Sequence, residues 1–152
     1  MADPDYAGAV KAIEDRLTAN WPTTPIAFEN ADAPTMVDGS NKLAPWVYCE
    51  VLSTESGIAG AGTPGDHVTV DEGLVQVVVF VPTGSGRLVA RQHATAIGEI
   101  FRVKEFYNAI AGACVRTWAP EIGPGNRSQS ENPKGSWWAV TVTIPFEFIH
   151  LA

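Results

Sequence analysis

A glycine-rich turn stands where a long apolar run ends and a helical pattern begins. Residues 84–86 read Gly-Ser-Gly, and such a turn can cradle a phosphate with its backbone N–H groups. A Walker loop requires Lys after its last Gly, but Arg87 stands there without the correct glycine spacing. A dinucleotide fingerprint requires a third Gly where Val89 stands. We therefore interpret the segment as a strand-to-helix turn, with Thr83 or Ser85 as the helix cap.

The other ionisable side chains form no recognisable site in the sequence. His67, His93 and His150 are far apart, and no acidic residue accompanies one of them at metal-ligand spacing. Asp71 and Glu72 are adjacent in a strand-like run, so their side chains point to opposite faces and cannot share a proton or a metal ion. We interpret both carboxylates as surface charge. We predict no catalytic, cofactor-binding or metal-binding residue and no cofactor.

Nucleophilic catalysis is also poorly supported. No Gly-x-Ser-x-Gly sequence occurs, so the nucleophile elbow of the α/β-hydrolases is excluded. The two cysteines, Cys49 and Cys114, are too few for a disulfide scaffold or a closed zinc site. Each lies in a strand-like run, and we expect both to be free, buried thiols. A pairing of Cys49 with a distant histidine stays possible geometrically, but nothing in the sequence favours it. We therefore predict that the protein is not an enzyme.

Composition narrows the class of protein further. The chain has 152 residues, 45% of them hydrophobic, and a net charge of −7, with no cluster of Lys or Arg. We expect one domain spanning residues 1–152 and no specific binding of nucleic acid, because phosphate contacts need clustered cations. No apolar run could span a membrane, and the acidic start lacks the apolar core of a signal peptide. Five Trp and only 18% charged residues suggest that partners cover part of the surface.

Two segments have helical periodicity. Tyr6, Val10, Ile13 and Leu17 form one apolar stripe, which Pro22 ends. We expect Asp3 to cap this helix and Pro4 to occupy its first position. A second helix over residues 87–101 places Ala90, Ala94, Ile97 and Phe101 on one side.

The remaining segments alternate between strands and loops. We predict strands at residues 25–29, 46–52, 67–81, 113–118 and 137–151, and long Gly/Pro-rich loops at 30–44, 54–66 and 119–136. Residues 74–81 are apolar at nearly every position, which indicates a central strand covered on both faces.

The last predicted strand has one apolar face. Its even positions from Trp138 to Phe148 are apolar, so we assign Trp138 to the core. Trp137 then faces outward, either as part of an interface or under the protein's own loops, and Trp46 poses the same question. Pro145 cannot donate a ladder hydrogen bond, so we expect an edge or a bulge there. The predicted fold is α+β: a single mixed or antiparallel sheet with two helices packed on one face, in the order α-β-β-β-α-β-β.

Several motifs resemble a family of bacteriophage tail terminator-like proteins. They are the segment Trp-Pro-Thr-Thr-Pro-Ile-Ala-Phe-Glu-Asn at 21–30 after an amphipathic helix, the Trp46-Val47 strand, and Val-Phe-Val-Pro-Thr-Gly-Ser-Gly at 79–86 before an Ala-rich helix. The last strand, with Trp138 near its start and Phe146 near its end, also fits.

The resemblance implies a structural virion protein of the tail or neck, assembled in the host bacterial cytoplasm. It implies a homo-oligomer, expected to be a hexameric ring, which ends tail-tube polymerisation and contacts the tail tube protein and the head–tail connector protein. No membrane is implied, and DNA passes through the ring. Our interface candidates, chosen for expected exposure and loop position, are Trp46, Tyr48, Arg116, Arg127 and Trp137.

Two alternatives stay open at this point. Another neck or tail-completion protein of the same fold would share these motifs, because a fold does not settle a position in the virion. A small-molecule binding module that uses the turn at 84–86 is the alternative from a different class.

Overall fold

The computed structural model describes residues 3–32, 37–128 and 137–152, so residues 129–136 of the predicted loop 119–136 and residues 33–36 of the loop 30–44 lie outside the described residues. The elements follow one another as α1 (Tyr6–Asn20), β1 (Ile26–Phe28), β2 (Trp46–Ile58), β3 (Val68–Pro82), α2 (Leu88–Phe101), β4 (Glu105–Phe106), β5 (Cys114–Thr117), β6 (Glu121–Ile122), β7 (Asn126–Ser128) and β8 (Trp137–Leu151).

The described strands form one mixed sheet. Its order is β1-β2-β3-β8-β5-β4, and β6 and β7 also pair with β8. The β1–β2 pair is parallel and the other pairs are antiparallel. The predicted α+β fold is confirmed, and the short strands β4, β6 and β7 are additions that the sequence did not predict.

Helix α1 begins at Tyr6, later than the Pro4 start that we predicted. Asp5, not Asp3, is its N-cap, and the Asp5 carboxylate accepts a hydrogen bond of 2.7 Å from the backbone N–H of Gly8. The predicted stripe faces the core, because Ile13 and Leu17 are fully buried. The guanidinium of Arg16 donates to the carbonyl of Ile100 at 2.9 Å, which fastens α1 to the end of α2.

Helix α2 begins without the side-chain cap that we expected. Its N-cap is Arg87, whose side chain makes no capping bond, and the Ser85 hydroxyl donates instead to the carbonyl of Pro82 at 2.7 Å. The predicted inner face is confirmed, since Ala90, Ala94, Ile97 and Phe101 are fully buried. Small residues let α2 approach the sheet closely.

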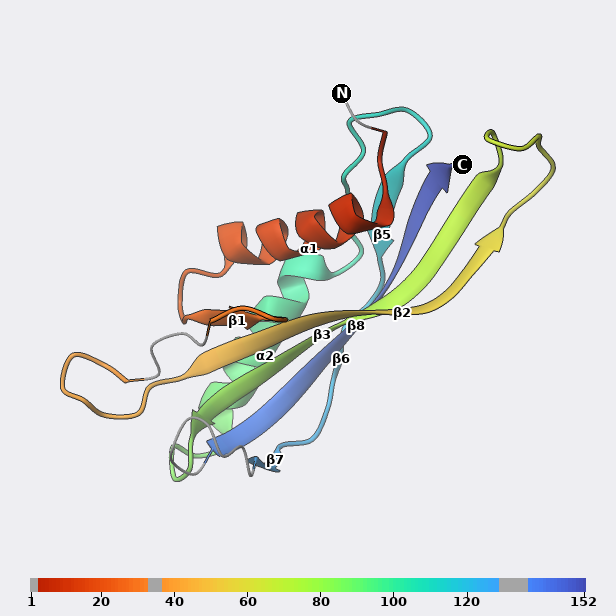
Figure 1. Cartoon of the computed structure of the whole chain (residues 1–152). Helices are drawn as coiled ribbons and strands as arrows, with labels where there is room; N and C mark the ends of the chain where they lie inside the picture. Colours follow the sequence, from red (N-terminus) through yellow and green to blue (C-terminus); the bar gives the residue numbers. More distant parts are fainter. Residues whose placement is uncertain (1–2, 33–36, 129–136) are drawn as a thin grey trace.

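Both helices pack on the same face of the sheet (Figure 1). The core between the layers is built from alternate residues of the long strands, as the period of two requires. From β3 it takes Val75, Val77, Val79 and Val81, and from β8 it takes Val140, Val142, Ile144, Phe146 and Phe148. β3 is central, as predicted, with β2 on one side and β8 on the other. The helices cover only one of its two faces, however.

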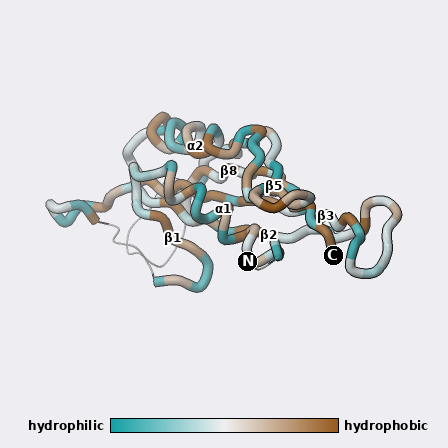
Figure 2. The backbone as a smooth tube through the Cα atoms, turned by 90° about the horizontal axis from the view of Figure 1, so that it is seen from above, coloured by the Kyte–Doolittle hydropathy of each residue, from teal (hydrophilic) through white to brown (hydrophobic). Residues whose placement is uncertain are grey.

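The Gly-rich segment that we predicted as a loop is partly strand. β2 continues to Ile58, so residues 54–58 belong to a long hairpin with β3. The hairpin projects beyond the helices, and Figure 2 shows its tip from above. We call this projection, residues 53–73, the arm. Ladder hydrogen bonds to β3 extend the strand where composition alone favoured a loop.

Pro145 is placed as its chemistry requires. Its carbonyl accepts a hydrogen bond from the N–H of Trp118 at 3.0 Å, so the backbone polar groups of Pro145 face the β5 side of β8. β5 ends at Thr117 and β6 begins at Glu121, so no ladder N–H is required between them. β8 is an inner strand without a bulge at Pro145, so the expected edge or bulge is replaced by this gap between β5 and β6.

Candidate interaction surface

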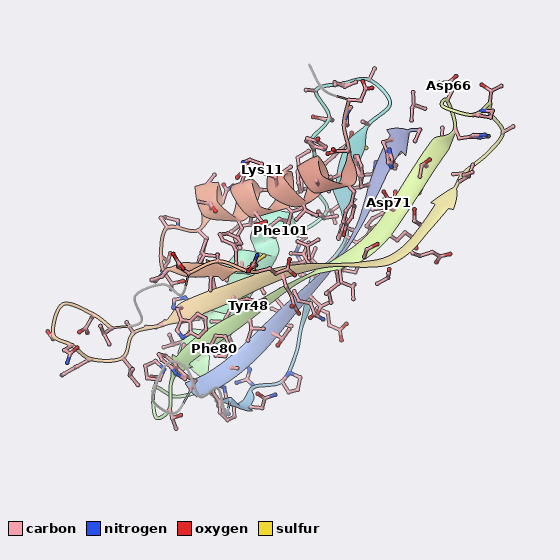
Figure 3. The ribbon with its side chains drawn as sticks, in the orientation of Figure 1. Lys11, Tyr48, Asp66, Asp71, Phe80 and Phe101 are labelled. Atoms are coloured by element: carbon pink, nitrogen blue, oxygen red, sulfur yellow. The ribbon has the colours of Figure 1, made fainter. Side chains whose placement is uncertain are left out.

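The face of the sheet opposite the helices carries the remaining alternate residues. We call it the helix-free face. Tyr48 of β2 and Phe80 of β3 lie on it, on the side away from α1 (Figure 3). Gln76 and Val78 of β3 lie on it too and are half-buried. Its two ends differ in character.

One end of the helix-free face is a small second core. Trp46 stacks on Phe80 with ring centroids 4.3 Å apart, and Trp137 meets Trp46 edge-on at 6.1 Å. Trp137 is completely buried, and Trp46 is 6% exposed. Of the two alternatives that the sequence left open for these tryptophans, an interface or coverage by the protein itself, the structure favours coverage by the protein itself. The register places Trp46, Phe80 and Ala139 side by side, so their rings and methyl group shield one another.

Trp138, next to Trp137 in the sequence, lies on the helix-covered face of the sheet. Trp138 packs against the main core, as predicted, although it is only partly buried. Gly125 comes so close that an added Cβ would lie 2.3 Å from the indole nitrogen of Trp138. Glycine is therefore required at this position.

The other end of the helix-free face holds an open groove of about 440 Å³ where the arm leaves the body. Leu74 and Pro145 are directly opposite in the register, and Trp118 hydrogen-bonds through its backbone to Pro145. Trp118 is 45% exposed, which is unusual for so large an apolar side chain. We did not select Trp118 from the sequence, although its place after the buried Thr117 carried the signal of an outward side chain.

Three glutamates form one row at the groove, and two of them, Glu72 and Glu147, line it. Glu55 lies opposite Glu72, and Glu72 lies opposite Glu147, so like charges are direct cross-strand neighbours. None of the three forms an ion pair with another residue in the described parts of the chain. At the end of the row, Arg116 pairs with Glu105 at 3.3 Å instead of with Glu147.

Asp71 points away from this row, as adjacent strand residues must, but it is not surface charge as we expected. It is 9% exposed and accepts hydrogen bonds from the Ser56 hydroxyl and the His150 imidazole, the latter at 3.1 Å. The His150 ring stacks on Phe148 at 4.4 Å. The cluster joins β2, β3 and β8 through satisfied polar groups and thereby stiffens the arm.

The other candidate residues lie in different places. Arg116 is half-exposed on β5, and Tyr48 is partly buried beside the second core. Arg127 lies on β7, opposite Trp138. The structure therefore does not gather Trp46, Tyr48, Arg116, Arg127 and Trp137 into one exposed patch.

The two free cysteines lie on opposite faces of the sheet. Burial raises the pKa of Cys49 to about 12, so this thiol stays protonated at neutral pH. Cys114 is only partly buried, and desolvation raises its pKa as well. Both cysteines are free, as predicted, but our expectation that both are buried is wrong for Cys114. His93, packed edge-on against Trp21 at 5.4 Å, has its pKa lowered by burial.

The described residues contain no group of three His, Cys, Asp or Glu side chains that could hold a metal ion. Within the same residues, no helix is both long and apolar enough to cross a bilayer. The turn at 84–86 uses positive φ values of 94° at Gly84 and 86° at Gly86, which explains both glycines as turn residues. These two glycines, Arg87 and Trp138 border a hollow of about 310 Å³.

Comparisons with known proteins agree with this architecture. No curated protein matches the chain. Fifteen chains of solved structures are similar to it. One of them, which carries no functional name, superposes with a TM-score of 0.59 at 21% identity over 93% of this chain and 91% of its own. At that identity, the likeness shows the fold alone. A family model described as phage tail terminator protein matches residues 9–146, and the chain therefore belongs to the phage tail terminator family, a structural and non-enzymatic family of the virion tail.

Proposed function

We propose that this protein caps the finished tail tube as a closed ring of six copies, stops tube polymerisation and offers a surface to the head–tail connector. The match to the tail terminator family over residues 9–146 is the observation that carries the proposal. The chain acts as one domain, residues 1–152, and assembles in the cytoplasm of the host bacterium.

The helix-free face is consistent with a subunit of an assembly. It holds an apolar groove with an exposed Trp118, and aromatic side chains of this kind often anchor protein contacts. Its partners in this proposal are further copies of the chain, the tail tube protein and the connector protein. Trp46 and Trp137 support the sheet from inside, while Tyr48, Arg116 and Arg127 stay candidate contacts.

Net charge also fits a ring through which DNA passes. Each copy carries −7, so six copies carry about −42. A ring of net negative charge repels the phosphate backbone of DNA and does not retain it.

Tail length tests the proposed function. A phage that lacks this protein should make tails of uncontrolled length that fail to join heads, as measured by electron microscopy. Supplying the wild-type chain from a plasmid should restore one length. Tails of normal length that join heads in the absence of the protein would contradict the proposal.

Solution mass tests the ring. Six copies of 16.2 kDa amount to about 97 kDa. Light scattering behind a sizing column, over a range of concentration and salt, should give this mass for the free ring, or for a ring that closes on added tail tubes. A chain that binds tubes as isolated monomers would contradict closure.

A further inference from the structure

The groove on the helix-free face combines apolar walls with an unbalanced charge. Leu74, Trp118 and Pro145 supply apolar surface, and Glu72 and Glu147 line the same groove. Like charges on direct cross-strand neighbours destabilise a sheet. The Glu55–Glu72–Glu147 row contains two such pairs. A ligand that fills this groove should therefore carry an apolar side chain flanked by cations.

The start of α2 has this chemistry. Leu88 is 63% exposed, although it is large and apolar. Arg87 precedes it and Arg91 follows one turn later, and the Arg91 guanidinium donates to the Arg87 carbonyl at 3.2 Å. Within the described residues, neither arginine forms an ion pair. We call Arg87, Leu88 and Arg91 the α2 ridge.

A second apolar side chain between cations fits less well. Val103 is 71% exposed between Arg102 and Lys104, but Arg102 already pairs with Glu99 at 2.8 Å. The backbone N–H of Val103 also bonds to the carbonyl of Trp118, so this turn lies beside the groove itself. The α2 ridge is therefore the better complement.

The groove and the ridge cannot meet within one molecule. Gly73, at the groove, and Pro82, before the ridge, are nine positions apart on β3, which corresponds to roughly 30 Å of extended strand. The groove lies on the helix-free face, whereas α2 lies on the other face (Figure 1). A contact between two different patches is heterologous, and repeating it builds a ring when the rotation closes.

We infer that the groove binds the α2 ridge of a second copy, with Leu88 against Leu74 and Trp118, and with Arg87 and Arg91 facing Glu72 and Glu147. This inference rests on the proposed ring and assigns its contact between subunits. The three parts of the evidence are the apolar groove, the unbalanced row of glutamates, and an exposed leucine beside two arginines that form no ion pair within the described residues. Charge complementarity between two surfaces of the same chain selects a second copy as the occupant.

A charge-swap experiment tests the contact. The first variant carries Glu72→Lys and Glu147→Lys, and the second carries Arg87→Glu and Arg91→Glu. Each variant repels itself, so half-assembly should require at least about tenfold more protein than the wild type requires. In an equal mixture, every groove meets a ridge of opposite charge in an alternating ring. The mixture should therefore recover the mass of the wild-type assembly.

Controls separate this contact from the ring and from misfolding. Glu29→Lys with Asp32→Lys changes the net charge as much as the groove variant does, on exposed residues away from the groove, and should assemble normally. Circular dichroism and thermal melting should show that each variant is folded. If the wild type assembles only on purified tail tubes, the same samples are compared on tubes.

The outcomes are distinguishable. Rings from both single variants would overturn the assigned contact and leave the proposed ring intact. Loss of assembly in both variants without recovery in the mixture would also overturn the pairing of these two surfaces. Normal tails without the protein would overturn the proposed function, whatever the charge swap shows.

Discussion

The two faces of the sheet are made from alternate residues of the same strands, and they differ in what covers them. On the helix-covered face, Val77 and Val79 of β3 are fully buried between both helices and the neighbouring strands. On the helix-free face, Gln76 and Val78 of the same strand are only half-buried. Nearly all residues at 74–81 are apolar, on both faces of the strand, but the helices of the chain cover only one of these faces.

The helix-free face itself divides into two parts. At one end, Trp46, Trp137 and Phe80 shield each other and form a second core. At the other, Trp118 stays exposed beside a row of glutamates. The chain can bury aromatics on this face where it needs stability. The open end is therefore better explained by contact with a partner than by incomplete folding.

The largest effect should come from the helix-covered core. Phe101→Ala removes a fully buried ring at the end of α2 and should cost about 3–5 kcal/mol of unfolding free energy. Trp118→Ala is the matched variant on the helix-free face, where the ring is 45% exposed, and should cost clearly less, about 1 kcal/mol. Urea denaturation of both variants measures the difference. Equal losses would show that the groove is core and not contact surface.

A smaller effect should appear where the two layers join. The Thr117 hydroxyl donates to the carbonyl of Phe101 and accepts from the backbone N–H of Lys104 at 3.0 Å. Thr117→Val leaves both backbone groups without this partner and should cost about 1–3 kcal/mol in the same denaturation experiment. Thr95→Val, at an exposed hydroxyl on α2, is the control and should be nearly neutral. A neutral Thr117→Val would mean that the α2–β4 turn does not depend on this hydroxyl.

Periodicity in the sequence was sufficient for both helices and for β3 and β8, because the helices and β8 bury one regular stripe of residues. It did not predict the second half of β2. It was insufficient for Trp46 and Trp137. Alternation says which face a side chain takes, but not whether the rest of the chain covers that face. The prediction that Asp71 is surface charge was wrong for a related reason. Its hydrogen-bond partners, Ser56 and His150, are 15 and 79 residues away in the sequence.

The groove was even less accessible to sequence reasoning. The glutamates of the row beside it come from β2, β3 and β8, and only the register makes them neighbours. A register irregularity between Ser53 and Glu55 fixes which residue of β2 faces Glu72. No local sequence pattern predicted this irregularity. Sequence reasoning identified the family from motifs that shape the fold, whereas the interaction surface depends on pairings between distant strands.

The smallest predicted effect has the opposite sign and separates stability from assembly. Glu72 is the middle residue of the glutamate row, so Glu72→Gln removes both like-charge pairs. At about 0.2–1 kcal/mol for each pair, this should stabilise the isolated chain by up to about 2 kcal/mol. Salt screens such repulsion, so the gain over the wild type should shrink as sodium chloride rises from 10 mM to 1 M. Glu121→Gln, at an exposed residue of β6 outside the row, should show neither effect. The same Glu72→Gln variant should require more protein for half-assembly, because the ridge loses one of its opposite charges. A variant that is both less stable and normally assembled would mean that Glu72 has a structural role and that the row is not maintained for a partner.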